Sequence, residues 1–147
     1  MKRRFLALVL AGCLAAVLST TAWASETPTS VSTEMELTTA LGDTAVTSIQ
    51  LKGNIDISNT LVVTKDVTLD LNGHVLKYEG ANKGSVIVVE NGGQLTIEDS
   101  NTSNLSHKFN PNGKLWVLDE ASGTEAVTGG VITGGTGYPF HLSSGTV

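Results

Sequence analysis

From Val46 onward the chain is a succession of short apolar runs with no helical period between them. The runs are rich in Val, Ile, Leu and Thr and are separated by Gly, Asn, Asp and Ser, which is typical of short strands joined by tight turns. They cover residues 47–51, 54–57, 61–64, 67–71, 75–78, 86–89, 94–98, 115–118, 127–128, 131–133 and 140–142. Because no helix separates consecutive strands, an α/β domain of the doubly wound or barrel type is excluded.

The same region matches itself at two spacings. A shift of 26 residues places Leu61-Val62-Val63 on Ile87-Val88-Val89, Leu69 on Leu95 and Leu71 on Ile97. A shift of 53 residues places Ile87 on Phe140, Val89 on Leu142 and Gly92 on Gly145. Internal repetition at such a period is typical of solenoids, in which each turn of the chain buries its apolar side against the next. We therefore expect parallel strands stacked about 4.7–4.9 Å apart.

This stacking makes specific predictions for individual side chains. Val63 should lie beside Val89 and Leu69 beside Leu95 inside the molecule, while Asp70 should face outward because side chains alternate along a strand. The outward set also includes Thr64, Thr68 and Thr96. The alternative is an antiparallel β-sandwich, because Asn72-Gly73 is a strong two-residue hairpin signal. The repeat favours the solenoid, since hairpin pairing gives no reason for a matched register.

Before the strands, Thr33-Glu34-Met35-Glu36 forms a capping box, in which the Thr33 hydroxyl accepts from the Glu36 amide and the Glu36 carboxylate reaches back. We expect one short helix over about residues 34–41, within a segment 33–42 that ends at Gly42. Residues 25–32 are expected to be a flexible lead-in. Residues 43–147 should carry the strands, with residues 99–128 as an insertion that interrupts the repeat.

Residues 1–24 have the three parts of a secretory signal. Lys2-Arg3-Arg4 is the positive segment, Phe5 to Leu18 is the apolar segment, and Ala22-Trp23-Ala24 predicts cleavage after Ala24. Because the apolar segment is shorter than a bilayer span, we expect no transmembrane segment in the mature chain. The alternative is a lipoprotein anchored through Cys13, since Leu10-Ala11-Gly12-Cys13 resembles a lipobox.

Removal of the leader leaves six lysines, no arginine and no cysteine against 14 acidic residues. This acidic balance argues against binding to nucleic acid. Without cysteine, the mature chain has neither disulfides nor a cysteine-ligated zinc site. Its stability must therefore come from packing and backbone hydrogen bonds.

Several segments together resemble secreted right-handed parallel β-helix proteins of the pectin-lyase-like type, which are common on bacterial surfaces. They are residues 33–41, 48–51, 54–57, 95–100 and 129–135, and above all Val67-Thr68-Leu69-Asp70-Leu71-Asn72-Gly73-His74. The resemblance implies an all-β, right-handed parallel β-helix whose open end is covered by the short N-terminal helix. It implies no activity, because this fold carries lyases, hydrolases and inert stalks alike.

The sequence supplies no complete catalytic set. Pectate-type lyases need a strong base that is usually arginine, which the mature chain lacks, and no adjacent Asp-Asp pair is present for a glycosidase. Asp70, Glu98 and Asp99 are expected to be solvated acids, and His74 is expected to have a role in a turn. No histidine pair has metal-ligand spacing. We predict no catalytic, cofactor-binding or metal-binding residues and no cofactor.

We expect an exported, non-catalytic stalk or adhesion module of a bacterial surface protein, located outside the cell or at its surface. Its partner would be an extracellular glycan or a host or cell-wall protein, and the candidate contact residues are Trp116 and Tyr138, because exposed rings stack on sugars. Trp116 and Phe109 could instead pack back on the body of the molecule. The alternative function is the N-terminal fragment of a polysaccharide lyase or glycosidase whose catalytic part lies beyond residue 147, in keeping with a repeat that stops unfinished at Val147.

Overall fold

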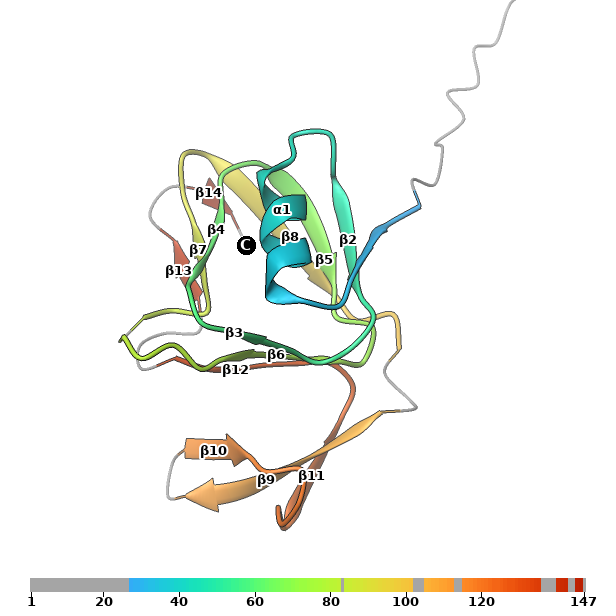
Figure 1. Ribbon diagram of the computed structural model, residues 1–147, viewed down its shortest axis with the longest axis vertical. Helices are drawn as coiled ribbons and strands as arrows, with labels where there is room; N and C mark the ends of the chain where they lie inside the picture. Colours follow the sequence, from blue (N-terminus) through green and yellow to red (C-terminus); the bar gives the residue numbers. More distant parts are fainter. Residues whose placement is uncertain are drawn as a thin grey trace, which may run out of the picture.

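The computed structural model describes residues 27–82, 84–101, 105–112, 115–135, 140–142 and 145–146. The leader (1–24), Cys13 and Tyr138 lie outside the described residues. One helix and a series of short strands make up the described part (Figure 1). Their bounds are β1 (Thr29–Val31), α1 (Glu34–Gly42), β2 (Ser48–Leu51), β3 (Ile55–Ile57), β4 (Leu61–Val63), β5 (Asp66–Asp70), β6 (Val75–Tyr78), β7 (Ile87–Val89), β8 (Gly93–Glu98), β9 (Ser106–Asn112), β10 (Leu115–Leu118), β11 (Glu125–Thr128), β12 (Val131–Gly134), β13 (Phe140–Leu142) and β14 (Gly145–Thr146).

Three of the sheets are built from parallel pairs. The first has five strands in the order β1-β2-β5-β8-β14, and the other two have three strands each, in the orders β12-β6-β3 and β13-β7-β4. In Figure 1 these three sheets enclose a common space with α1 at one end of it. From β2 to β8, strands that follow one another along the chain therefore lie in different sheets, and each pairs with a strand from another part of the sequence.

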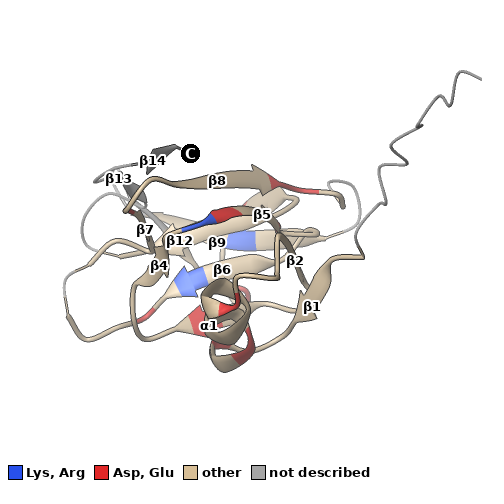
Figure 2. Ribbon diagram, turned by 90° about the horizontal axis from the view of Figure 1, so that it is seen from above, with Lys and Arg blue, Asp and Glu red and all other residues tan. Residues whose placement is uncertain are grey.

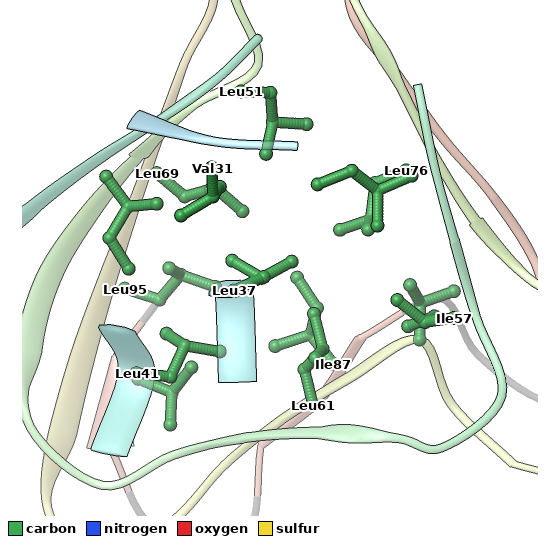
Figure 3. Packing of buried hydrophobic residues seen from close by; sticks show 14 of the residues in the cluster. Val31, Leu37, Leu41, Leu51, Ile57, Leu61, Leu69, Leu76, Ile87 and Leu95 are labelled. Atoms are coloured by element: carbon green, nitrogen blue, oxygen red, sulfur yellow. The ribbon is translucent and has the colours of Figure 1, made fainter. Parts of the chain in front are cut away.

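The enclosed space is filled by one hydrophobic cluster to which all three sheets contribute. Leu69 of β5, Leu76 of β6 and Ile87 of β7 are each at most 2% exposed and point toward one another (Figure 3). Leu95 belongs to the same cluster, which confirms that Leu69 and Leu95 share one environment. Each such side chain contributes about 1.5–3 kcal/mol when it is fully buried. The cluster therefore joins the three sheets in one folded unit.

Helix α1 closes one end of this cluster. Its N-terminus is capped as the capping box predicts, since the Thr33 hydroxyl accepts from the Glu36 amide at 3.2 Å. The Glu36 carboxylate reaches back to the amide of Ser32 at 2.7 Å. A helix of nine residues is not stable alone in water, so it depends on its buried side chains. These are Leu37, Ala40 and Leu41, and all three belong to the cluster.

The structure differs from the expected lead-in at Thr29–Val31. These residues form strand β1, which pairs in parallel with β2 in the register Thr29↔Ile49 and Val31↔Leu51. Val31 is 2% exposed and belongs to the core, so this segment is ordered by packing as well as by backbone pairing. The sequence does not predict this strand, because the segment is rich in Ser and Thr and only one of its side chains is buried.

The register of the strands agrees with the repeat in one sheet only. Val63 pairs with Val89 as predicted, and β13 pairs with β7 in the predicted register of Phe140 with Ile87. In the five-stranded sheet, by contrast, Leu95 pairs with Val67 and not with Leu69. Gly145 likewise pairs with Gly93, one residue away from the predicted Gly92. The turn that leads into β8 is longer than the turn that leads into β5, so the register slips between the two sheets.

Residues Ser106–Thr128 form a sheet of a different kind, in the order β10-β9-β11. Both pairings are antiparallel, with Trp116 of β10 opposite Pro111 and Val127 of β11 opposite His107. This sheet falls inside the expected insertion 99–128 and projects from the side of the molecule formed by β6 and β12 (Figure 1). It is named the projecting sheet below.

The prediction of a regular right-handed parallel β-helix is wrong for the described residues. Their strands form four small sheets of mixed type, three parallel and one antiparallel, and the paired strands follow no fixed repeat. Ile55 of β3 pairs with Leu76, 21 positions later, whereas Val75 of β6 pairs with Val131, 56 positions later. The physical reason is that turns and inserts of unequal length separate the strands, so that equal spacing holds only locally.

The alternative of an antiparallel β-sandwich is wrong as well. Strands β5 and β6, which Asn72-Gly73 joins, lie in different sheets and do not pair with each other. Asn72 and Gly73 both have positive φ, at 48° and 78°, and they turn the chain from one sheet into the next. The dipeptide predicts a tight turn correctly, but the two strands beside it diverge. The chain is mostly β with one helix, in small and mixed sheets.

Candidate functional site

Two acidic side chains meet polar backbone groups where the five-stranded sheet ends. Asp70 is the last residue of β5, and Asp99 follows β8 directly. Two polar residues contact Asp70: Asn72, in the turn after β5, and Ser100, in the segment after β8. We name Asp70, Asn72, Asp99 and Ser100 the corner cluster. It is the place where the structure brings together two of the three acids considered above, so its chemistry decides whether they are available to a substrate.

The carboxylate of Asp70 is held by four hydrogen bonds. Its Oδ1 accepts from the amides of Asn72 and Ser100, both at 2.9 Å, and its Oδ2 accepts from the Ser100 hydroxyl at 2.6 Å and from Gln50 Nε2 at 2.7 Å. Burial acts to raise the pKa of Asp70, but the hydrogen bonds from Ser100, Gln50 and Asn72 outweigh it and hold the pKa below its ordinary value. Asp70 points away from the core, since its neighbours Leu69 and Leu71 belong to the hydrophobic cluster. It is only 7% exposed, however, so the prediction that it is a solvated acid is wrong.

Asp99 is engaged in a similar way. Its two oxygens accept from the amides of Gly73 and Gly130, each at 2.6 Å. Gly73 cannot be replaced without strain, because its φ is +78° and a Cβ there would lie 2.7 Å from the carbonyl oxygen of Asn101. The carboxylate therefore ties the turn after β5 to the segment before β12. Its role here is to satisfy backbone donors in two turns.

A histidine links the projecting sheet to the same turn. His107 of β9 is 5% exposed, with Nδ1 2.8 Å from Glu120 Oε1 and Nε2 2.8 Å from the carbonyl oxygen of Gly73. The ring therefore joins the side chain of Glu120 to the turn that contains Gly73. Sequence analysis missed this pair, because Glu120 lies in the turn between β10 and β11 and comes close to His107 of β9 only when the antiparallel sheet forms.

His74 lies close to this arrangement but has a different role. Its backbone amide donates to the carbonyl of Leu71 at 2.8 Å and closes the Asn72-Gly73 turn, which confirms the predicted role in a turn. Burial lowers the pKa of the His74 side chain, and the charges of His107 and Lys52 lower it further, against an opposing effect of Asp99.

The arrangement stabilises turns and offers little to a reacting molecule. Both carboxylates of the corner cluster point their oxygens at hydrogen-bond donors of the chain itself. Among the described residues, no group of three or more His, Cys, Asp and Glu side chains is placed to hold a metal ion. Glu98, the third acid considered above, is exposed at the end of β8. The cluster therefore has the chemistry of a structural joint between three segments.

Of the two residues predicted to contact a ligand, the structure describes the backbone of Trp116 only. Trp116 is in strand β10 of the projecting sheet, where its Cα partner is Pro111. Tyr138 lies outside the described residues. Phe109 of β9 is 3% exposed, which agrees with the alternative prediction that it packs back on the body of the molecule. Val117, next to Trp116, is 50% exposed.

In the part of the chain that the structure describes, no helix is long and apolar enough to cross a membrane.

Comparison with known proteins gives one finding. A family model described as "Putative pectate lyase-like adhesive domain" matches residues 28–131, which is most of the chain. The match begins just before β1 and runs into β12, so it includes both the parallel sheets and the projecting sheet. No curated protein and no solved structure matches the chain.

Proposed function

Since the chain belongs to the family of pectate lyase-like adhesive domains, we propose that it is an adhesion module of an exported bacterial surface protein that binds glycan without cleaving it. The family places the chain among extracellular or surface adhesive domains in general terms. The glycan ligand, the lack of catalysis and the bacterial source belong to the proposal.

The observation that carries the non-catalytic part is the state of the acids in the corner cluster. A polysaccharide lyase or glycosidase needs carboxylates that are free to bind a cation, a water molecule or the substrate. Asp70 instead accepts four hydrogen bonds from the chain and Asp99 accepts two. Releasing either carboxylate would leave buried backbone donors without a partner, at a cost of about 1–3 kcal/mol for each group.

The projecting sheet supports the adhesive part of the proposal. It stands away from the three parallel sheets (Figure 1), and such inserts are frequent sites of recognition. Trp116 lies in strand β10 of this sheet, and the next residue of the strand, Val117, is half exposed. We assign ligand contact to Trp116 and Tyr138, because aromatic rings supply apolar faces for pyranose rings.

Residues 1–24 are the proposed export signal, with cleavage after Ala24. A lipoprotein anchored through Cys13 is the alternative. Intact mass of the exported chain decides between them. A mature chain beginning at Ser25 supports the secreted form, whereas a lipid-modified chain beginning at Cys13 supports the lipoprotein.

A glycan array that includes pectin, cell-wall polysaccharides and host-type glycans tests the proposal with the full chain. We expect binding to a subset of glycans, weakened about tenfold by Trp116→Ala or Tyr138→Ala. Thr96→Ala on β8, an exposed change in another sheet, is the control and should leave binding intact. Equal binding by all variants would remove the two rings from the site, and release of unsaturated uronides from pectin would show that the chain is an enzyme.

A further inference from the structure

A groove runs along α1 on a face that the proposed glycan site does not use. One wall is the exposed side of the helix, including Glu34 and Met35, and the other is the segment around β4, including Thr60 and Val62. The space between the walls has a volume of about 750 Å³. This is within the range of sites that bind small molecules or a peptide side chain.

The groove carries an unusual share of exposed apolar surface. Among the described residues, three large hydrophobic side chains are exposed, namely Met35, Val62 and Val117. Two of the three, Met35 at 77% and Val62 at 46% exposure, line this groove, one on each wall. Apolar side chains gathered in one concave region indicate a binding surface more strongly than scattered ones do.

Three of the threonine hydroxyls that line the groove donate hydrogen bonds to backbone carbonyls of the chain. Thr38 Oγ1 donates to the carbonyl of Glu34 at 2.8 Å, Thr39 Oγ1 to the carbonyl of Met35 at 2.7 Å, and Thr60 Oγ1 to the carbonyl of Ser85 at 2.8 Å. Each hydroxyl has one proton and two lone pairs, so these oxygens can only accept from a ligand. A molecule that supplies hydrogen-bond donors therefore matches these three oxygens.

The charge of the groove also favours a ligand that donates hydrogen bonds, because the groove contains the carboxylate of Glu34. Glu34 accepts from the amides of Ser58 and Asn59 through one oxygen, at 2.9 and 3.1 Å. The Ser58 amide lowers the pKa of Glu34, and the Asn59 amide adds to this effect while burial opposes it, so the group stays ionised. Among the residues that the structure describes, no Lys, Arg or His lines the groove. Figure 2 shows acidic ribbon, in red, on and beside α1.

The cation nearest to the end of the helix is not available to neutralise this charge. The ammonium group of Lys65 donates to the carbonyls of Ala40 at 3.0 Å and Val46 at 2.5 Å, and also to the carbonyl of Asp43. Burial lowers the pKa of Lys65, while the charge of Asp43 acts in the opposite direction. With its three donors used at the C-terminus of α1, Lys65 leaves Glu34 without a cationic partner among the described residues.

We propose that this groove binds a basic segment of a partner protein, with the stem of a lysine or arginine side chain lying between Met35 and Val62 and its cationic end beside Glu34. A long aliphatic stem matches the apolar walls. A cationic end that only donates matches the carboxylate and the acceptor-only hydroxyls. The inference goes beyond the proposed glycan adhesion and does not depend on it, since it concerns another face and another class of partner.

The test measures fluorescence anisotropy of a labelled peptide in which lysines and leucines are separated by glycines. The reference is the same peptide with glutamate in place of lysine. The full chain should bind the lysine peptide more tightly than the glutamate peptide, and added salt should weaken the binding. Glu34→Gln, which keeps an acceptor for Ser58 and Asn59, should weaken it about threefold.

Matched changes elsewhere separate this site from general attraction to an acidic protein. Glu125→Gln on β11 removes the same charge, and Val117→Ala on β10 shortens the third exposed apolar side chain; both should leave binding unchanged. Val62→Thr alters the wall opposite the helix without touching α1, and it should weaken binding even if Glu34→Gln loosens the helix. Equal binding of the two peptides overturns the proposal, as does equal loss in Glu34→Gln and Glu125→Gln, or no loss in Val62→Thr.

Discussion

Asp70 shows how one side chain joins three segments that are far apart in the sequence. Its oxygens hold the side chain of Gln50, the amide of Asn72, and the amide and hydroxyl of Ser100. Hydrogen bonds to an ionised group are stronger than those between neutral groups. The group is also almost fully buried, so its loss is not compensated by water.

Replacing Asp70 by Asn should therefore be costly. The new amide group presents donors to partners that are themselves donors, and about 2 kcal/mol of unfolding free energy should be lost. Asp56→Asn on β3 is the control, because Asp56 is exposed and should change stability by less than about 0.5 kcal/mol. Urea unfolding followed by circular dichroism measures both. Equal midpoints for the two variants would show that the hydrogen bonds of Asp70 contribute nothing.

The same residue predicts a dependence of stability on pH. The pKa of Asp70 in the folded chain is lowered from the ordinary value of 3.8, so folding favours the ionised form. Its contribution is complete above the unfolded pKa and is lost as the pH falls through the folded pKa. The unfolding free energy should decrease from about pH 5 to about pH 2, and Asp70→Asn should decrease less over this range. Parallel curves for the two proteins would exclude Asp70 as the source.

The sequence could not predict this role of Asp70. Alternation of side chains along the strands assigns Thr64, Asp70 and Thr96 to the outer face. Thr64 and Thr96 are exposed as this predicts, but Asp70 is buried on that face. At Asp70 the chain turns through Asn72-Gly73, and the ends of β2 and β8 bring Gln50 and Ser100 over the carboxylate. A period of two describes a strand, but it does not describe the turn that follows.

At the scale of elements, the projecting sheet is fastened to the body by few side chains. His107 bonds Glu120 within the projecting segment and the carbonyl of Gly73 in the turn between β5 and β6, while Asp99 bonds the amide of Gly130 just before β12. The sequence predicts that residues 99–128 interrupt the strands. It does not predict a sheet, because its two antiparallel pairings depend on contacts between β9 and both later strands.

Replacing His107 by Gln should loosen this attachment. Glutamine lacks the two ring nitrogens through which His107 contacts Glu120 and the Gly73 carbonyl, so about 2 kcal/mol of local stability should be lost. Hydrogen exchange should become faster in β9 and β11 and stay unchanged in β2 and β5. Lys108→Gln, an exposed change on the same strand, is the control. Unchanged exchange in β9 would show that the antiparallel sheet needs no link through His107.

At the scale of the whole molecule, three parallel sheets surround one hydrophobic core that α1 closes at one end. The repeat predicts the pairing of β4 with β7, because the segments around these strands match residue for residue. It also predicts the pairing of β5 with β8, but in the wrong register, because the turn before β8 is longer than the turn before β5. Apolar patterning therefore identifies the buried faces, while turn lengths set the register.

Disulfide formation between chosen cysteine pairs tests this arrangement most directly. Thr68 of β5 is the Cα partner of Thr96 of β8, whereas the repeat of 26 residues would place Gln94 beside it. In a chain with Cys13→Ser, the pair Thr68→Cys and Thr96→Cys should form a disulfide readily, since parallel neighbours are about 4.8 Å apart. The pair Thr68→Cys and Gln94→Cys should not, at about 8 Å. The opposite result would contradict the register on which the core and the corner cluster both depend.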